Sequence, residues 1–335
     1  MSKIKLLLII LSLLLLSFFG VLLFLNSPVS KEFKSKEFEV KAGETAKTIS
    51  LRLYSEGFIR SPSFFQMLCR FTGSSKKLQK GLYLLNDNMS SLQIMDFIIK
   101  GKVYTVRITI PEGWPVVKIS KLLAAKGLIS STKEFNSFCF FSNVLKSKFS
   151  FLPERNLEGF LYPDTYDFPK NTTVRQIAST MVSRFSNKIL NIYKEDIRKN
   201  KYSLYEILKL ASLIEKEARV PQERFLISQV FHLRLKKNMA LFCDPTVAYA
   251  VGKHYGERLS RKDLNFDSPF NTYIYTGLPP TPICNPGISS FEAALKPANT
   301  DYLYFVSKND GTHFFSKTLK EHNEAVKKYQ LKKKN

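Results

Sequence analysis

The stretch Leu210–Pro221 reads LASLIEKEARVP and predicts a helix that is apolar for most of its length. The helix ends by presenting two carboxyl groups, Glu215 and Glu217, separated by one residue. A glutamate at the edge of an apolar surface can keep its proton near neutral pH, because burial disfavours the charged form and raises the pKa. Such a glutamate can act as a general acid, so this helix is the first candidate for an active site.

Helical periodicity does not choose between the two glutamates. At about 100° per residue, the apolar face is centred near Ile207, Ile214 and Ala218. Glu215 and Glu217 lie on opposite sides of that face, each roughly 80° from its centre. Considered without the rest of the chain, a helical Glu-x-Glu pair more often marks a solvated face, so the functional interpretation depends on other motifs.

The N-terminus predicts a membrane anchor. Residues 6–25 are almost continuously apolar, which is about the length needed to cross a bilayer as a helix. The short lysine-bearing tail at 1–5 favours a cytoplasmic position for that end, and 26–36 then form a linker. A cleaved signal peptide is the alternative, although this apolar run is longer than the usual ~7–15 residues of such a signal.

The formal net charge is +23, which reflects either a lysine-rich composition or an anionic partner such as cell-wall carboxylates or lipid headgroups. No nucleic-acid-binding motif is present, so no nucleic-acid partner is expected. The cysteines and histidines lack metal-ligand spacing, and the sequence therefore predicts an active site without metal. They are Cys69, Cys139, Cys243, Cys284, His232, His254, His313 and His322.

An internal repeat relates Val40–Phe65 to Ile110–Phe135, which align without a gap. Each copy predicts a strand, a glycine turn, an amphipathic helix that stops at Gly57 or Gly127, and the start of a second helix. Between the copies, Lys80–Met89 predicts a hairpin. The order of elements resembles LysM-type glycan-binding modules, and a purely structural duplication is the equal alternative.

Further motifs follow in the second half of the chain. Leu157–Tyr166 reads LEGFLYPDTY, whose aromatic residues could form a platform for sugar rings or, alternatively, a buried aromatic turn. Turn-forming motifs with Asp or Asn suit the recognition of hydroxyl-rich ligands. They are DPT at 244–246, NTY at 271–273, GLPP at 277–280, NPG at 285–287, YLYFV at 302–306 and EHN at 321–323.

In this order, the motifs resemble the YceG-like endolytic murein transglycosylases over nearly the whole chain. The resemblance implies cleavage of peptidoglycan between N-acetylmuramic acid and N-acetylglucosamine, with 1,6-anhydro ends and no cofactor. It implies that Glu217, the second glutamate of the E-K-E triplet, is catalytic, while Glu215 raises its pKa or holds a loop. The residues expected to bind substrate are Glu158, Tyr162, Asp164, Glu215, Asp244, Thr246 and Asn271.

The implied fold is α+β, with a single N-terminal transmembrane helix, a small LysM-like domain at 37–102 and a larger α+β catalytic domain at 103–335. The second repeat copy, 110–135, lies at the start of the larger domain or bridges the two domains. The implied location is the cell inner membrane, single-pass, with the catalytic domain outside the cytoplasm in the periplasmic or extracytoplasmic space. There it would shorten nascent glycan strands near the peptidoglycan synthases and so end their polymerisation.

Two positions depart from the family pattern: Leu233 replaces an asparagine and Phe242 replaces a glutamine. The loss of two polar side chains affects the expected sugar contacts more than the expected reaction. Two rival functions remain open. A hydrolytic muramidase would need a second carboxylate, from Glu158, Asp164 or Asp244, and a non-catalytic peptidoglycan-binding scaffold would need none.

Overall fold

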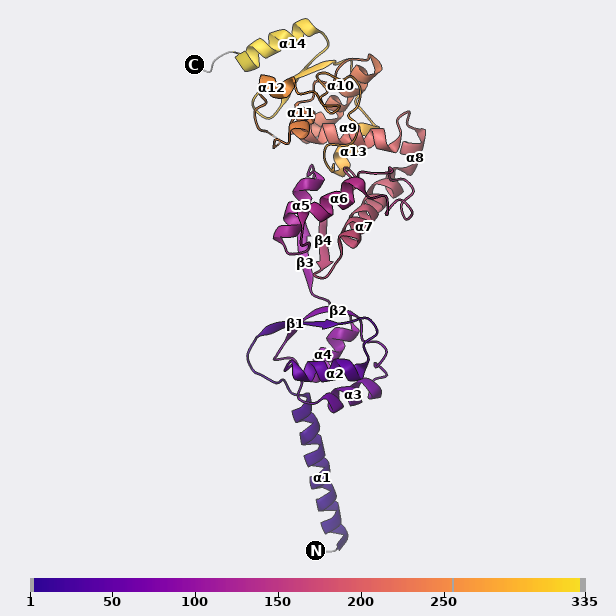
Figure 1. Ribbon diagram of the computed structural model, residues 1–335, viewed down its shortest axis with the longest axis vertical. Coiled ribbons are helices and arrows are strands. Elements are labelled where there is room, and N and C mark those ends of the chain that lie inside the picture. Colours follow the sequence, from indigo (N-terminus) through magenta and orange to yellow (C-terminus); the bar gives the residue numbers. More distant parts are fainter. Residues whose placement is uncertain (1–2, 255, 332–335) are drawn as a thin grey trace. The chain divides into compact units, whose positions relative to one another are not determined.

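The computed structural model describes residues 3–254 and 256–331, which form a mixed α+β structure (Figure 1). Two compact units are formed: Met1–Val106 with Asp167–Thr172, and Arg107–Tyr166 with Thr173–Asn335. Within the described residues the strands form three two-stranded sheets, β1 with β2, β3 with β4 and β5 with β6. The predicted α+β class is therefore confirmed.

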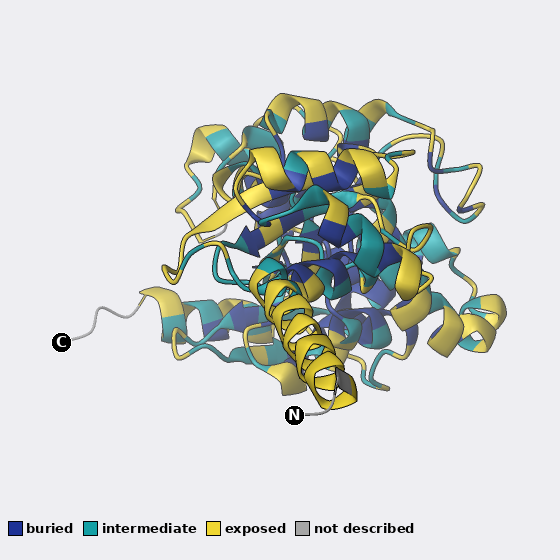
Figure 2. Cartoon of the chain, turned by 90° about the horizontal axis from the view of Figure 1, so that it is seen from below, coloured by how far each residue is buried: buried dark blue, intermediate teal, exposed yellow. Residues whose placement is uncertain are grey.

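The N-terminal helix α1 (Lys3–Asn26) is apolar along its length. The most apolar 18-residue window of its segment Ile4–Asn26 has a mean hydropathy of 3.0, and none of that window is buried. Figure 2 shows this helix exposed over most of its length. Of the helices that the structure describes, it alone is long and apolar enough to cross a membrane. A membrane anchor and a signal sequence both fit such a helix.

The first unit builds a small core between one sheet and three helices. Its elements are β1 (Ser35–Val40), α2 (Ala46–Ser55), α3 (Pro62–Phe71), β2 (Gly81–Asn86) and α4 (Ser91–Ile99). Strands β1 and β2 pair antiparallel, with Phe38 opposite Tyr83, and both side chains are buried in the core. The hairpin predicted at Lys80–Met89 is wrong, because this segment supplies the single strand β2, which pairs with β1 instead of folding on itself.

After α4 the same order of elements recurs along the chain. They are β3 (Thr105–Thr109), α5 (Val116–Ala125), α6 (Thr132–Phe141), β4 (Thr165–Pro169) and α7 (Val174–Phe185). Both bounds of α5 and of α6 lie 70 residues after those of α2 and α3. The repeat found in the sequence is therefore a repeat of structure, and it extends beyond the aligned segment to a second strand and a third helix.

The two copies differ most in the connection before their second strand. It spans residues 72–80 in the first copy and 142–164 in the second, where it carries most of the LEGFLYPDTY motif. Gly159 in this motif has φ +92°, and a Cβ there would lie 2.7 Å from Cγ of Pro282. The backbone N–H of Leu161 donates to Oδ1 of Asn285 at 2.9 Å. The motif is therefore packed into the second unit and does not stand out as a surface platform.

The rest of the second unit surrounds α9 (Leu204–Glu217), whose buried face includes Ile207, Leu213 and Ile214. A capping box formed by Ser203 and Glu206 starts this helix. Helix α9 lies beside α10 (Arg224–Lys236) and α13 (Ile288–Leu295). The other elements are η1 (Ser186–Leu190), α8 (Asn191–Lys199), η2 (Pro221–Glu223), α11 (Asp244–Val251), α12 (Arg261–Leu264), β5 (Tyr304–Ser307), β6 (His313–Ser316), α14 (Leu319–Val326) and η3 (Lys327–Leu331).

The predicted helix over LASLIEKEARVP is confirmed up to Glu217 and ends there. Ala218 has extended backbone (φ −75°, ψ 117°), although its N–H still bonds to the carbonyl of Ile214 at 2.9 Å. Because the helix ends at this point, Glu217 occupies the last helical position, next to the segments that follow.

Candidate active site

Glu217 lies where two adjoining clefts of the second unit meet. One cleft has a volume of about 530 Å³ and the other about 480 Å³, which is within the range of ligand sites. The residues that line both clefts are Glu217, Asp244, Tyr273, Ser307 and His313. Glu217 itself is partly exposed, so its carboxyl group is accessible to a ligand placed across the two clefts.

The surroundings of Glu217 raise its pKa to about 7. Burial is the largest cause, since it penalises the carboxylate form, and the negative charge of Asp244 acts in the same direction. A hydrogen bond from the Cys243 thiol and the positive charge of Arg234 lower the pKa in part. Near neutral pH the group is therefore populated both with and without its proton, which suits a group that first donates and then accepts one.

Cys243 is held beside Glu217 by two buried threonines. The Cys243 N–H donates to Oγ1 of Thr272 at 3.0 Å, and the Thr246 hydroxyl donates to the Cys243 carbonyl at 2.7 Å. The two threonine hydroxyl oxygens lie 2.9 Å apart. Thr246, which the resemblance places in contact with substrate, is fully buried and instead fixes the turn that carries Cys243.

Asp244 and Asn271 were both expected to bind substrate, and the structure places them differently. Asp244 is exposed at the start of α11 and accepts a hydrogen bond from the Tyr273 hydroxyl at 2.5 Å. Asn271 is fully buried, and its side-chain amide donates to the carbonyls of Leu264 and Phe266, both at 2.9 Å. Asp244 is therefore available to a ligand, whereas Asn271 shapes the loop behind it.

Glu215 faces a different part of the unit from Glu217. Its carboxylate accepts hydrogen bonds from the N–H of Gly287 at 3.2 Å and from the hydroxyl of Ser290 at 2.6 Å. Both donors lie at the N-terminal end of α13, where a negative charge is favourable. Neither cleft beside Glu217 is lined by Glu215. Its contacts correspond to the loop-holding role that the resemblance allowed for it.

Glu158 is a buried structural carboxyl group. Its oxygens accept hydrogen bonds from the N–H of Val116 at 3.0 Å, the amide of Asn285 at 3.1 Å and the hydroxyl of Tyr249 at 3.3 Å. Burial raises its pKa to about 8. Helix α5 has a proline, Pro115, as its N-cap residue without a side-chain hydrogen bond, so Glu158 supplies that cap from elsewhere in the chain. The expectation that it binds substrate is corrected, because a fully buried side chain cannot touch a glycan.

Tyr162 and Asp164 also lie outside the two clefts. Tyr162 is buried, and its carbonyl accepts a hydrogen bond from the hydroxyl of Tyr166 at 2.5 Å. Asp164 forms an ion pair with Arg184 at 2.6 Å. The aromatic platform expected for LEGFLYPDTY is replaced by the buried aromatic turn that was its alternative, because the motif packs against residues 282–285.

Many of the cleft residues were not predicted as site residues from the sequence, and three of them are Arg234, His313 and His322. Arg234 is buried and donates to the carbonyls of Leu303 and Leu241, both at 2.8 Å. The ring of His313 bonds to the carboxylate of Glu223 at 2.6 Å. His322 stacks on Tyr304 with ring centroids 5.3 Å apart. These residues come from three separate segments, and no local pattern joins them before the chain folds.

The two residues that depart from the family pattern, Phe242 and Leu233, lie in different surroundings. Phe242 lines the larger cleft, is 49% exposed and has φ +50°. Its ring lies 5.2 Å from that of Tyr273. Leu233 is partly buried in α10 and lines neither cleft. Of the two replacements, only that of glutamine by Phe242 therefore changes the surface presented to a ligand.

Comparisons with known proteins agree over most of the chain. The YceG-like family matches residues 38–328. A relative from Bacillus subtilis (strain 168), named endolytic murein transglycosylase, is 39% identical over 319 residues, which cover 91% of this chain and 88% of the relative. A relative of the same name from Streptococcus pneumoniae (strain ATCC BAA-255 / R6) is 26% identical over 345 residues, covering 92% of this chain and 61% of the relative.

A solved structure is similar as well. The crystal structure of a putative YceG-like protein from Listeria monocytogenes has a TM-score of 0.62 and 33% identity. The match covers 88% of this chain and 100% of the Listeria chain.

Proposed function

The chain belongs to the YceG-like family, and from this premise we propose that it is a peptidoglycan lytic transglycosylase in which Glu217 is the catalytic acid and base. The names of its relatives support the activity. The single observation that carries the assignment of Glu217 is its position: a partly exposed carboxyl group with a pKa of about 7, at the meeting point of two clefts.

The reaction needs one carboxyl group that works twice. Protonated Glu217 gives its proton to the glycosidic oxygen as the bond from that oxygen to C1 of the muramic acid unit breaks. The resulting carboxylate takes the proton from the C6 hydroxyl as its oxygen bonds to C1, which leaves a 1,6-anhydro end and restores the acid. The attack is intramolecular, so no water has to be held in position, whereas an ordinary glycosidase uses two carboxyl groups.

Of the three residues expected to supply a second carboxylate for the rival muramidase, only Asp244 lines the clefts, and Glu257 lines the cleft of about 480 Å³ as well. Glu158 is fully buried, and Asp164 is paired with Arg184 outside the clefts. Asp244 lines both clefts beside Glu217. The names of the relatives favour the lytic reaction over hydrolysis, and a pKa near neutrality at Glu217 is of no use to a scaffold that only binds.

We extend the proposal to the place of action. Residues 6–25 of α1 anchor the chain in the cytoplasmic (inner) membrane, with 1–5 in the cytoplasm, 37–102 as a LysM-like domain and 103–335 as the catalytic domain outside the cytoplasm. The exposed apolar length of α1 supports the anchor, and the boundary between the compact units after Val106 supports the division. The enzyme then acts on nascent strands close to the peptidoglycan synthases.

The test is digestion of purified peptidoglycan by the detergent-solubilised full chain, with the products identified by mass spectrometry. Wild type yields 1,6-anhydro-muramic acid ends, one water lighter than hydrolysis products. Glu217→Gln lowers the rate by about 10²–10⁴-fold. Glu215→Gln is the matched control on the same helix, because glutamine keeps an oxygen that can accept from Gly287 and Ser290. Reducing ends alone, or loss of activity in the control but not in Glu217→Gln, would overturn the assignment.

A further inference from the structure

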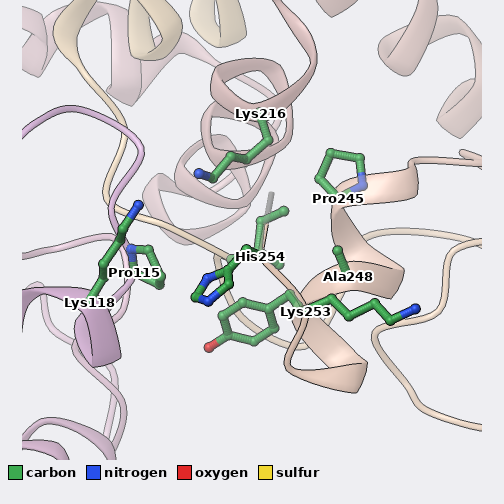
Figure 3. Close-up of a pocket in the computed structure, with 9 residues that line it drawn as sticks. Pro115, Lys118, Lys216, Pro245, Ala248, Lys253 and His254 are labelled. Carbon is green, nitrogen blue, oxygen red and sulfur yellow. The ribbon is translucent and has the colours of Figure 1, made fainter. Parts of the chain in front are cut away.

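A third cavity of the second unit lies beside the catalytic clefts, and Figure 3 shows side chains of α5, α9 and α11 around it. Its volume is about 80 Å³, which is space for only a few water molecules and too small for a sugar ring. Pro245 and Ala248 line both this cavity and the cleft of about 480 Å³, so it belongs to the wall of the site already described. A surface that the catalytic function leaves unexplained lies in the first unit, at the end of α1.

The end of α1 is joined to the first unit by hydrogen bonds as well as by the chain itself. The hydroxyl of Ser91 donates to the carbonyl of Leu25 at 3.3 Å, and the N–H of Leu92 donates to Oδ1 of Asn26 at 3.0 Å. Ser91 and Leu92 belong to the first turn of α4, and helices α1 and α4 are in contact. The last residues of α1 are therefore held against the start of α4.

Arg60 holds the residues that follow α1. Its guanidinium donates to the hydroxyl oxygen of Ser27 at 3.1 Å and to the carbonyl of Pro28 at 2.6 Å, and it lies 4.7 Å from the ring centroid of Phe24. One side chain of the first unit therefore contacts both the last turn of α1 and the chain beyond it, which restricts bending between them. The segment 26–36, expected to be a linker, begins as a stiff joint.

The depth of this joint in a bilayer follows from the length of α1. With 6–25 in the membrane, the helical span is about 30 Å, which matches the thickness of the hydrocarbon core. Leu25 then lies at the outer edge of the hydrocarbon, and the headgroup layer beyond it is roughly 5–7 Å thick. Groups at hydrogen-bond distance from Leu25 and Asn26 lie within that layer at any tilt of α1. The first turn of α4 is therefore at the level of the lipid headgroups.

The joint presents two exposed apolar side chains and one cation. Leu92 is 46% exposed and Val29 is 36% exposed. At the boundary between headgroups and acyl chains, such side chains bury apolar area that would otherwise face water. Arg60 donates to Ser27 and Pro28 through neutral acceptors, and a guanidinium at this depth can bind the phosphate of a lipid headgroup. Both features suit a phospholipid surface.

We propose that Arg60, Val29 and Leu92 form a membrane-contact surface, which seats the first unit on the headgroup layer of the bilayer that α1 crosses. This inference rests on the proposed membrane anchor and is independent of the catalytic assignment. The partner is the phospholipid of that same bilayer, because the surface is bonded to the end of the helix embedded in it. The first unit is thereby held at one depth and does not hang from a flexible linker.

The test measures the depth of single fluorescent labels on the full chain, reconstituted in vesicles of phosphatidylethanolamine and phosphatidylglycerol. The four native cysteines are buried, so the label attaches to an introduced, exposed cysteine. Leu23→Cys, in the last turn of α1, marks the outer edge of the hydrocarbon, and Leu92→Cys reports the first unit. Quenching by lipids with nitroxides at known depths should place the label at 92 within roughly 10 Å of the depth of the label at 23.

Removing the joint should release the first unit from the surface. The double variant Asn26→Ala/Arg60→Ala loses the bonds to Leu92, Ser27 and Pro28. The label at 92 should then be quenched less by the nitroxide lipids and more by iodide in the water. Arg70→Ala is the matched control, since this exposed arginine removes the same charge from the other end of α3 and should leave the depth of the label unchanged.

Three outcomes would overturn the proposal, and they differ in what else they affect. A label at 92 that is quenched by iodide alone, on a chain that stays in the vesicles through an alkaline wash, would refute the seating and leave the anchor intact. Equal effects of the double variant and Arg70→Ala would refute the role of the joint. Release of the chain by the wash would refute the anchor, and this inference with it, while the cleavage assay with Glu217→Gln would still test the catalytic assignment.

Discussion

The alkaline limb of the pH–rate profile should respond in opposite directions to two substitutions beside Glu217. The acid must enter the reaction protonated, and its pKa is raised to about 7. In wild type, kcat/KM is therefore level on the acid side of this value and falls about tenfold per pH unit above it, since kcat/KM reports the free enzyme.

The causes of the raised pKa give the sign of each shift. Asp244→Asn removes a negative charge that disfavours ionisation of Glu217, so the pKa falls and the limb moves to lower pH. Cys243→Ala removes a thiol that donates to the carboxylate, so the pKa rises and the limb moves to higher pH. Opposite movements from neighbouring positions are hard to obtain from a general loss of folding.

The expected magnitudes are modest. An exposed charge pair contributes about 0.2–1 kcal/mol, and one pKa unit corresponds to about 1.36 kcal/mol, so Asp244→Asn lowers the limb by roughly 0.2–0.7 unit. A hydrogen bond to a charged group contributes about 1.5–3 kcal/mol, but a thiol is a weak donor. We therefore expect Cys243→Ala to raise the limb by about 0.5–1 unit.

The assay measures kcat/KM on soluble glycan strands from pH 5 to 9 (roughly two units either side of neutrality). Cys243→Ser keeps a donor and should leave the limb close to wild type. Cys284→Ala controls for the loss of a buried thiol, because Cys284 donates to the carbonyl of Ser212 instead. If both Asp244→Asn and Cys243→Ala move the limb the same way, or neither moves it, Glu217 is not the group that titrates and the reasoning fails.

Three further predictions concern Glu158 and the altered cleft wall. The pKa of Glu158 is about 8 in the folded protein, whereas the ordinary value for a glutamate is 4.5. The folded state therefore binds more protons between these two values, and stability falls as pH rises through that window. Glu158→Gln should flatten the dependence of Tm on pH, and a slope equal to that of wild type would contradict this. Glu158→Ala leaves the N–H of Val116 unpaired and should cost about 2–4 kcal/mol in denaturant unfolding. Phe242→Gln should lower KM for glycan strands because Phe242 lines the cleft, whereas Leu233→Asn should leave KM unchanged; equal effects on KM would show that the cleft wall is misplaced.

Short-range patterns in the sequence predicted a large part of the fold. Apolar residues at helical spacing located α9, and glycine stops with serine starts located the helices of both repeat copies. These signals depend on backbone preferences within a few residues, so they are readable without the folded chain. The helical bounds at a spacing of 70 residues follow from them. The extension of the repeat to β4 and α7 could not be predicted from the sequence, because a long insertion separates β4 from the aligned segment.

Only the tertiary structure decided where each carboxyl group lies. Glu215 and Glu217 are equivalent by periodicity, and they differ because residues more than 70 positions away, Gly287 and Ser290, bond to the first and leave the second at the clefts. The sequence also left the role of Glu158 open, whereas in the structure this residue is fully buried and accepts a hydrogen bond from the N–H of Val116. Burial and charge, which set a pKa, are sums over neighbours that folding brings together from distant segments. A sequence can therefore name the acidic residues, while the fold assigns one to the cleft, one to a helix end and one to the core.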